Sequence, residues 1–220
     1  MRKNLVIYGA GGLARETLWM INSDDTLSKE FNVVAFVVDE EFFDNAHSSV
    51  MGVTVKSSEY LYQEAVNDAP CVVIAIANAA ARMACFNRLK QLPYLSFPTI
   101  VHPSCNIAPD AKIGDGTLIH TKCTITVGVT IGQCVLLNGQ VTIGHDAVID
   151  DFVTIMPRCD ISGNVKIGKC ASIGAKSFVL EGKRIGENAI AAPGSIILRN
   201  VPPNVTVMGN PAKIFLKHDD

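Results

Sequence analysis

The side chains best suited to proton transfer in this sequence are its five histidines, because an imidazole with a pKa of about 6.5 can accept a proton at neutral pH. His145 is the strongest candidate among them. It lies two places after Ile143, a phase that predicts an outward-facing side chain, and Asp146 follows it directly. The pattern therefore favours His145 as a general base, with Asp146 either its partner or a solvated surface carboxylate.

The other four histidines fit this chemistry less well. His47 falls in a polar loop and His218 in the C-terminal tail, so we expect neither to react. His102 precedes a proline in a linking segment, which is typical of a structural contact. His120 follows Ile119 at a place where glycine is frequent, so it is expected to point outward at a bend and is the second candidate base.

A glycine-rich turn predicts a phosphate site near the N-terminus. The segment GAGGLA, residues 9–14, follows an apolar run and precedes a helical pattern, so helix N-terminal amides are placed to hold a phosphate. Asp39 ends the next apolar run and can meet a ribose or a base edge. Only about four strands fit before residue 98, roughly half of what a dinucleotide needs, so we expect a mononucleotide or nucleotide-sugar. The predicted ligands are Gly9, Gly11, Gly12, Leu13 and Asp39. The alternative is a glycine turn that merely packs the helix against the sheet.

The cysteines predict neither a metal site nor a covalent intermediate. No C-x-x-C pair occurs and the number is odd, so a reduced, cytoplasmic state is expected, with most thiols filling the core. Cys134 and Cys170 are expected to point outward, but neither has an adjacent histidine. The seven are Cys71, Cys85, Cys105, Cys123, Cys134, Cys159 and Cys170.

Composition excludes several classes of function. The net charge is −2 and no basic stripe occurs, so nucleic acid is not an expected partner. The short apolar run at the N-terminus ends in glycines and does not resemble a secretory signal. Since no apolar run approaches membrane-spanning length, no membrane span is expected.

An unbroken period of six residues runs through the C-terminal half. Every sixth residue from Ile107 to Ile197 is apolar, and the residue two places earlier is small except at Lys183. Glycine follows the apolar residue six times, at Gly114, Gly132, Gly144, Gly168, Gly174 and Gly186. A strict period of six fits neither a helix nor an alternating strand. It predicts a coil of three short strands that takes eighteen residues per turn, with the apolar and small columns inside and glycine relieving the backbone at the bends. Each coil is stable only where its neighbours cover it.

The first hundred residues predict a small Rossmann-like α/β domain. Apolar strand patterns alternate with helical patterns, which indicates a parallel sheet. Strands are expected at 5–9, 31–39, 53–55 and 71–77, and helices at 10–23, from 57 or 58 to 66, and at 78–92. Three prolines between 92 and 104 mark a boundary. We therefore expect a nucleotide-sugar-binding domain at 1–98 and a coiled β domain at 99–220.

The combination of these features resembles one family. A short α/β domain with YGAGG, followed by HPS, an unbroken hexapeptide repeat with GHD, and a closing NVPPNVTVMGNPAKIF, is similar to the sialic acid O-acetyltransferase-like family of nucleotide-sugar acetyltransferases. The resemblance covers nearly the whole chain. It implies a left-handed parallel β-helix, acetyl-CoA as co-substrate, a nucleotide-sugar on the N-terminal domain, and homotrimers with active sites between subunits. It also implies a place in glycan biosynthesis.

The resemblance assigns roles to residues of the repeat. It implies that His145 is the general base of a direct acetyl transfer and that Asp146 raises its basicity. The backbone amide of Gly163 would meet the acetyl-CoA carbonyl, and Asn138 would contact the sugar or form part of an asparagine ladder at a corner. Thr154, Ala175 and Pro193 are expected to contact CoA, although the amino-sugar enzymes often have histidine at the place of Thr154.

Three hypotheses follow. The leading one is N-acetylation of a nucleotide-linked 4-amino-sugar, with O-acetylation of a free sugar such as sialic acid as a close variant. A zinc lyase built on the same β-helix would need three histidine ligands, and the repeat holds only His120 and His145. A non-catalytic scaffold is the third class.

Overall fold

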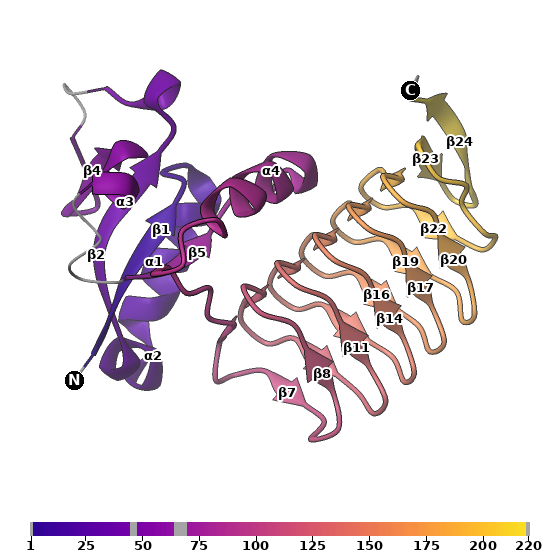
Figure 1. The fold of residues 1–220 in the computed structure, drawn as a ribbon. Helices are drawn as coiled ribbons and strands as arrows, with labels where there is room; N and C mark the ends of the chain where they lie inside the picture. Colours follow the sequence, from indigo (N-terminus) through magenta and orange to yellow (C-terminus); the bar gives the residue numbers. More distant parts are fainter. Residues whose placement is uncertain (1, 45–47, 64–69, 219–220) are drawn as a thin grey trace.

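The N-terminal half forms a parallel sheet flanked by helices (Figure 1). The computed structural model describes residues 2–44, 48–63 and 70–218. Within these residues the sheet has the order β3-β4-β2-β1-β5, in which β3 alone is antiparallel to its neighbour. Its strands are β1 (Lys3–Tyr8), β2 (Phe31–Val38), β3 (Ser49–Val50), β4 (Val53–Ser57) and β5 (Cys71–Ile74). The helices are α1 (Gly12–Ser23), α2 (Asp25–Glu30), η1 (Glu40–Phe42), α3 (Glu59–Gln63) and α4 (Ala79–Leu89).

The four expected strands and three expected helices are present, with shorter bounds for several. Residues 64–66, the end of the helix expected after Ser57, lie outside the described residues. The short helix α2 was not predicted. It begins because the carboxylate of Asp24 accepts hydrogen bonds from the amides of Thr26 and Leu27, at 2.9 and 3.0 Å.

The period of six folds into a left-handed parallel β-helix with three faces (Figure 1). The first face contains β6 (Ile100–Val101), β9 (Leu118–Ile119), β12 (Leu136–Leu137), β15 (Thr154–Ile155), β18 (Ser172–Ile173), β21 (Ile190–Ala191), β23 (Val205–Gly209) and β24 (Ala212–Lys217). The second contains β7 (Asn106–Ile107), β10 (Thr124–Ile125), β13 (Thr142–Ile143), β16 (Asp160–Ile161), β19 (Phe178–Val179) and β22 (Ile196–Ile197). The third contains β8 (Lys112–Ile113), β11 (Thr130–Ile131), β14 (Val148–Ile149), β17 (Lys166–Ile167) and β20 (Arg184–Ile185).

The inward columns are in register from coil to coil. Ile143 pairs with Ile125 below it and with Ile161 above it, so each coil takes eighteen residues. From Ile119 to Ile197 the apolar column is buried, as is the column of small residues. The stacked apolar side chains therefore form one continuous core along the axis, as the period predicted.

The glycines of the repeat serve a different purpose from the expected one. Positive φ occurs at the third residue after the inward one, as at Asp146 (φ 59°) and Phe152 (φ 60°), and not at the glycine that follows it directly. An added Cβ on Gly144 would lie 2.5 Å from the amide nitrogen of Gly163 in the next coil. The expectation that glycine relieves the bend is therefore wrong: these residues lack a side chain because the next coil passes too close.

The C-terminal strands close the far end of the first face. Strand β23 pairs with β21 in parallel and with β24 antiparallel. The hairpin lies at the end of the β-helix farthest from the N-terminal domain (Figure 1). No helix among the described residues is long and apolar enough to cross a membrane.

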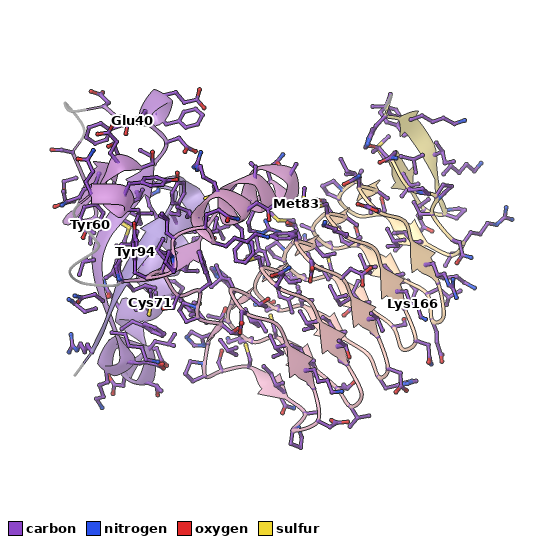
Figure 2. All side chains as sticks on the ribbon, viewed as in Figure 1. Glu40, Tyr60, Cys71, Met83, Tyr94 and Lys166 are labelled. Atoms are coloured by element: carbon purple, nitrogen blue, oxygen red, sulfur yellow. The ribbon has the colours of Figure 1, made fainter. Side chains whose placement is uncertain are left out.

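The two domains share a buried interface. Phe152, Cys134 and Cys170 stand on one corner of the β-helix and pack in a single cluster with Phe86 of α4. The prediction that both thiols point outward is correct for the β-helix alone, but the N-terminal domain covers them, so they are buried. Figure 2 shows Met83 where α4 meets the coils, and the Cys170 Sγ to Met83 Sδ distance is 3.6 Å.

Candidate active site

His145 and Asp146 form a hydrogen-bonded pair on the corner between the second and third faces. The imidazole Nδ1 lies 3.0 Å from Asp146 Oδ2, and both side chains are at least half exposed. Asp146 can turn back toward the ring because its backbone adopts positive φ. A carboxylate accepts only, so Nδ1 donates whenever the acid is ionised, and Nε2 of a neutral ring then carries the lone pair.

Gly163 lies one coil above His145 on the same corner. An added Cβ on Gly163 would lie 2.6 Å from Cε1 and 2.8 Å from Cδ2 of the imidazole. Only a residue without a side chain therefore leaves room for the ring. Among the hydrogen bonds of the described residues, the Gly163 amide donates none, so it remains available to a ligand beside Nε2.

Three of the remaining predicted acetyl-CoA and sugar contacts lie on another corner. Ala175 and Pro193 follow β18 and β21, between the first and second faces, as Asn138 follows β12. The Asn138 Oδ1 atom accepts a hydrogen bond from the amide of Gly139 at 2.7 Å, which uses one of its polar atoms locally. The structure thus brings together His145, Asp146 and Gly163, and places Ala175, Pro193 and Asn138 across the second face from them.

Thr154 belongs to neither corner. Its side chain is 3% exposed, and its hydroxyl donates to the carbonyl of Ala77 at 2.8 Å and accepts from Arg82 at 2.9 Å. This placement does not support the expected contact with CoA, because the hydroxyl is enclosed between the two domains. No local pattern around Thr154 indicates this burial, because its hydrogen-bond partners Ala77 and Arg82 are in the other domain.

A cavity of about 610 Å³ opens on the N-terminal domain at the carboxyl ends of β1 and β2. The glycine turn, Asp39, two residues of η1 and one side of α4 line it. Such a crevice is the usual ligand site of an open parallel sheet. Glu41 and the exposed ring of Phe42 stand at its wall.

The four residues predicted in the glycine turn divide into two pairs. Gly9 and Gly11 line the cavity, and Gly9 has φ 111° with its amide bonded to the Val37 carbonyl at 2.7 Å. An added Cβ there would lie 3.0 Å from the Ala75 carbonyl oxygen, so Gly9 is required on both counts. Gly12 and Leu13 do not line the cavity, and Leu13 packs partly buried against the domain core.

Asp39 lies in the cavity and is already paired. Tyr8 donates a hydrogen bond to Asp39 Oδ1 at 2.6 Å, and Arg88 of α4 forms an ion pair with the same oxygen. Arg88 also bonds the Tyr8 hydroxyl at 2.6 Å. Burial, followed by the bond to Asp39, raises the pKa of Tyr8, so the phenol stays protonated and remains a donor. Burial also raises the pKa of the neighbouring Cys85 to about 12, which makes its thiol a poor nucleophile.

Tyr8 and Arg88 were missed from the sequence. Tyr8 precedes the glycine turn directly and Arg88 is a basic residue near the end of a predicted helix, but nothing local joins either to Asp39. Arg88 is the one basic residue among those lining the cavity.

The other histidines are in different surroundings. His120 was expected to point outward, but it is 5% exposed, and its Nε2 has no hydrogen-bond partner among the described residues. His102 bonds Ser104 through Nδ1, at 2.7 Å from the hydroxyl, a local contact of the expected kind. His218 lies 2.8 Å from the Thr206 hydroxyl through Nε2, and His47 lies outside the described residues. Within the described ranges, no group of three or more potential ligands could hold a metal.

Comparison with known proteins finds a family model that matches the first domain. Residues 4–89 match the PglD N-terminal domain family. A curated serine acetyltransferase of Buchnera aphidicola subsp. Schizaphis graminum is 34% identical over 114 residues, which are 52% of this chain and 41% of that protein. The chain thus spans less than half the length of this relative.

Solved structures match nearly the whole chain. The acetyltransferase domain of PglB from Neisseria gonorrhoeae, solved alone and with acetyl coenzyme A, is 26% identical with a TM-score of 0.84. The structure without ligand covers 97% of this chain and 100% of that one. A mutant of perosamine N-acetyltransferase from Caulobacter crescentus, in complex with CoA and GDP-perosamine, shares the fold, with TM-score 0.86, 23% identity and 96% coverage of both chains. The resemblance inferred from the sequence is confirmed by these matches.

Proposed function

We propose, on the premise that residues 4–89 belong to the PglD N-terminal domain family, that the whole chain is an acetyl-CoA-dependent N-acetyltransferase of a nucleotide-linked 4-amino-sugar. The observation that carries this proposal is the exposed His145–Asp146 pair with the bare α-carbon and free amide of Gly163 stacked against its ring. A base oriented by an acid, next to a free backbone donor, is what acyl transfer from a thioester requires.

The mechanism is direct transfer. With Nδ1 donating to Asp146, Nε2 of His145 takes the proton of the acceptor amine as the nitrogen attacks the thioester carbonyl. The carbonyl oxygen becomes an oxyanion, to which the Gly163 amide donates. The carbon–sulfur bond then breaks, and the imidazolium returns the proton to the departing CoA thiolate. No cysteine takes part.

The cavity on the N-terminal domain supports a nucleotide-linked acceptor. Gly11, the N-cap residue of α1, lines the cavity, so the N-terminus of this helix, where a phosphate is favoured, adjoins it. Arg88 adds a positive charge at the same cavity, and Asp39 offers a carboxylate to ribose or base. A free sugar would leave these groups without a purpose, which favours the amino-sugar nucleotide over the sialic acid variant.

A homotrimer with active sites between subunits is part of the proposal. His145 and Gly163 lie on one corner of the β-helix, whereas Ala175 and Pro193 lie on the next, so one copy cannot offer both sets side by side. A neighbouring copy laid against the first corner brings them together. Val127, one coil below His145 on that corner, is 57% exposed and supplies apolar surface for such a contact.

The test is an acetyl-transfer assay. Purified protein is incubated with acetyl-CoA and a panel of UDP-, GDP- and dTDP-linked 4-amino-sugars, and free CoA is followed. One amino-sugar should turn over, and His145→Ala should lower kcat by about 10²- to 10⁴-fold, the usual contribution of a general base. Asp146→Asn should lower kcat less, because the ring keeps its place but loses the orienting carboxylate.

Other outcomes point to other functions. CoA release only with a hydroxyl acceptor such as free sialic acid would assign O-acetylation. Full activity in His145→Ala would require another base. No CoA release with any acceptor, despite nucleotide binding, would contradict the proposed reaction and favour a non-catalytic scaffold.

A further inference from the structure

Arg82 is a fully buried arginine that joins the two domains. It is 2% exposed and lies on α4, yet most of its hydrogen bonds go to the β-helix. Nε donates to the Cys134 carbonyl at 2.9 Å, and one terminal nitrogen donates to the carbonyls of Phe152 (2.7 Å) and Val153 (3.1 Å) and to the Thr154 hydroxyl. The other terminal nitrogen donates to the carbonyls of Ile76 at 2.6 Å and Ala77 at 3.1 Å.

Three of the carbonyl oxygens that accept from Arg82 have no other hydrogen-bond donor among the described residues. Among the described residues, Arg82 is the one donor to the carbonyl oxygens of Cys134, Phe152 and Ile76. All its partners are neutral, and no ion pair of Arg82 occurs in the described part of the chain. Burial lowers the pKa of Arg82 to about 10, which leaves the guanidinium charged at neutral pH. A buried charge held only by neutral dipoles is costly unless every N–H donor is satisfied, as each one of Arg82 is here.

One side of helix α4 lines the nucleotide cavity, and another side contacts the β-helix. Ala81, Ala84, Cys85 and Arg88 line the nucleotide cavity. The side chains of Arg82, Met83 and Phe86 contact the β-helix: Phe86 packs on Phe152 with ring centroids 5.6 Å apart. The wall of the cavity and the contact with the β-helix are therefore two sides of one helix. The carbonyl of Ile76, a residue that lines the cavity, accepts a hydrogen bond from Arg82.

The coil that Arg82 holds is the one that carries the base. Cys134 and Phe152 are equivalent corners of successive turns, and His145 lies between them in the chain. The guanidinium bonds both ends of this single turn. Any tilt of the N-terminal domain would therefore change the position of the cavity relative to the turn that bears His145.

We propose that Arg82 is a positioning residue: it fixes the nucleotide cavity against the turn that bears His145, so that a tethered acceptor is delivered in a set geometry. This inference rests on the proposed function for its kinetic consequence. The proposal predicts that replacing Arg82 lowers kcat without weakening the binding of nucleotide or acetyl-CoA, because Arg82 belongs neither to the cavity nor to the His145 corner. It also holds if the base that receives the acceptor belongs to a neighbouring copy, since each copy carries the same fixed geometry.

The test compares Arg82→Met and Arg82→Lys with wild type, and with Arg15→Met as the control for loss of an exposed arginine of the same domain. For the acceptor that wild type turns over, kcat of Arg82→Met should fall roughly 10- to 100-fold, the effect of a misplacement near 1 Å. The dissociation constant of the matching nucleoside diphosphate, measured by calorimetry, and the KM of acetyl-CoA should stay at wild-type values. Arg82→Lys should recover part of the rate, since one ammonium reaches only some of the carbonyls.

A second readout does not depend on turnover. In wild type, adding the nucleoside diphosphate should slow amide hydrogen exchange in the segments around 134 and 152, and this response should vanish in Arg82→Met. Wild-type kcat in both variants, or nucleotide affinity that falls in step with kcat, would overturn the inference. If Arg82→Met does not fold, Arg82→Lys decides by the same kcat and binding comparison. If wild type turns over no acceptor, the proposed function fails, and the exchange response alone decides whether Arg82 couples the domains.

Discussion

The ring of His145 lies directly against the α-carbon of Gly163, one coil further along the β-helix. The imidazole occupies the volume that a side chain at 163 would fill, so the base and the bare backbone position are a single steric unit. The steric contact can be tested by mutating Gly163 to alanine, because Gly163 does not have positive φ and alanine strains no backbone there.

Gly163→Ala should slow acetyl transfer while leaving the protein folded. The new methyl would lie 2.6 Å from Cε1, so the half-exposed ring must rotate away from Asp146. We expect kcat to fall by roughly 10- to 100-fold, as for other small displacements of a catalytic group.

Gly182→Ala, on the same corner one coil further, is the matched control. Its φ of 70° makes alanine strained, but nothing lies within 4 Å of an added Cβ, so stability should fall and kcat should hold. Equal kcat in both variants would contradict the steric account.

Arg88→Met should remove the preference of the cavity for phosphorylated ligands. Arg88 is the one basic residue lining it, and a nucleoside diphosphate carries negative charge that the start of α1 alone would hold less well. Calorimetry should show that the variant binds the diphosphate about tenfold more weakly, roughly 1.4 kcal/mol. Affinity for CoA should not change. An unchanged diphosphate affinity would place the phosphates elsewhere.

His120→Gln should flatten the pH dependence of stability on the acid side. Burial, with a smaller effect from His102, lowers the pKa of His120 to about 4. The unfolded chain binds a proton near pH 6.5 and the folded chain does not until about pH 4, so folding stability falls as pH drops through this window. Wild type should lose about 2 kcal/mol more than the variant between pH 7 and pH 5, measured by urea unfolding at fixed protein concentration. Parallel losses would mean that His120 gains a proton in the folded state.

Val127→Asp should disrupt assembly and activity together. Val127 is exposed on the corner of His145, and a charge there would have to be desolvated by a neighbouring copy. Sedimentation should report a smaller species, with little acetyl transfer. Trp19→Asp, which changes an equally exposed apolar residue of α1, should leave both unchanged. A trimer that persists in Val127→Asp would move the interface to another face.

The sequence predicts well those features that depend on residues close together in the chain. The inward columns and the α/β alternation follow from local spacing, and the structure confirms them. For Asp146 the sequence left a solvated carboxylate open, and the structure places its Oδ2 atom 3.0 Å from Nδ1 of His145. Apart from the role expected of the repeat glycines, the errors concern outward-facing positions. Cys134, Cys170 and His120 point away from the β-helix axis in the pattern, yet all three are buried.

The interface between the domains could not be read from either half alone. Arg82 is one of several polar residues in a helical pattern, and its partners lie 52 to 72 residues away in the β-helix. Thr154 occupies a strand position that a repeat leaves solvent-facing, and only the docked domain encloses it. Arg88 and Asp39 likewise meet across 49 residues. Such contacts have no period, so no spacing rule reports them.

Arg82 bonds the carbonyls of two successive corners, so it restricts where the β-helix can gain or lose residues. Insertions that are not multiples of eighteen residues would rotate His145 off its corner. A whole extra coil between Cys134 and His145 would carry the base about 4.8 Å along the axis, away from the cavity. The same coil added beyond Pro193, before the terminal hairpin, would leave the distance between cavity and base untouched. Homologues longer or shorter by one coil should therefore place that difference outside the turn that Arg82 holds, for example at the far end of the stack.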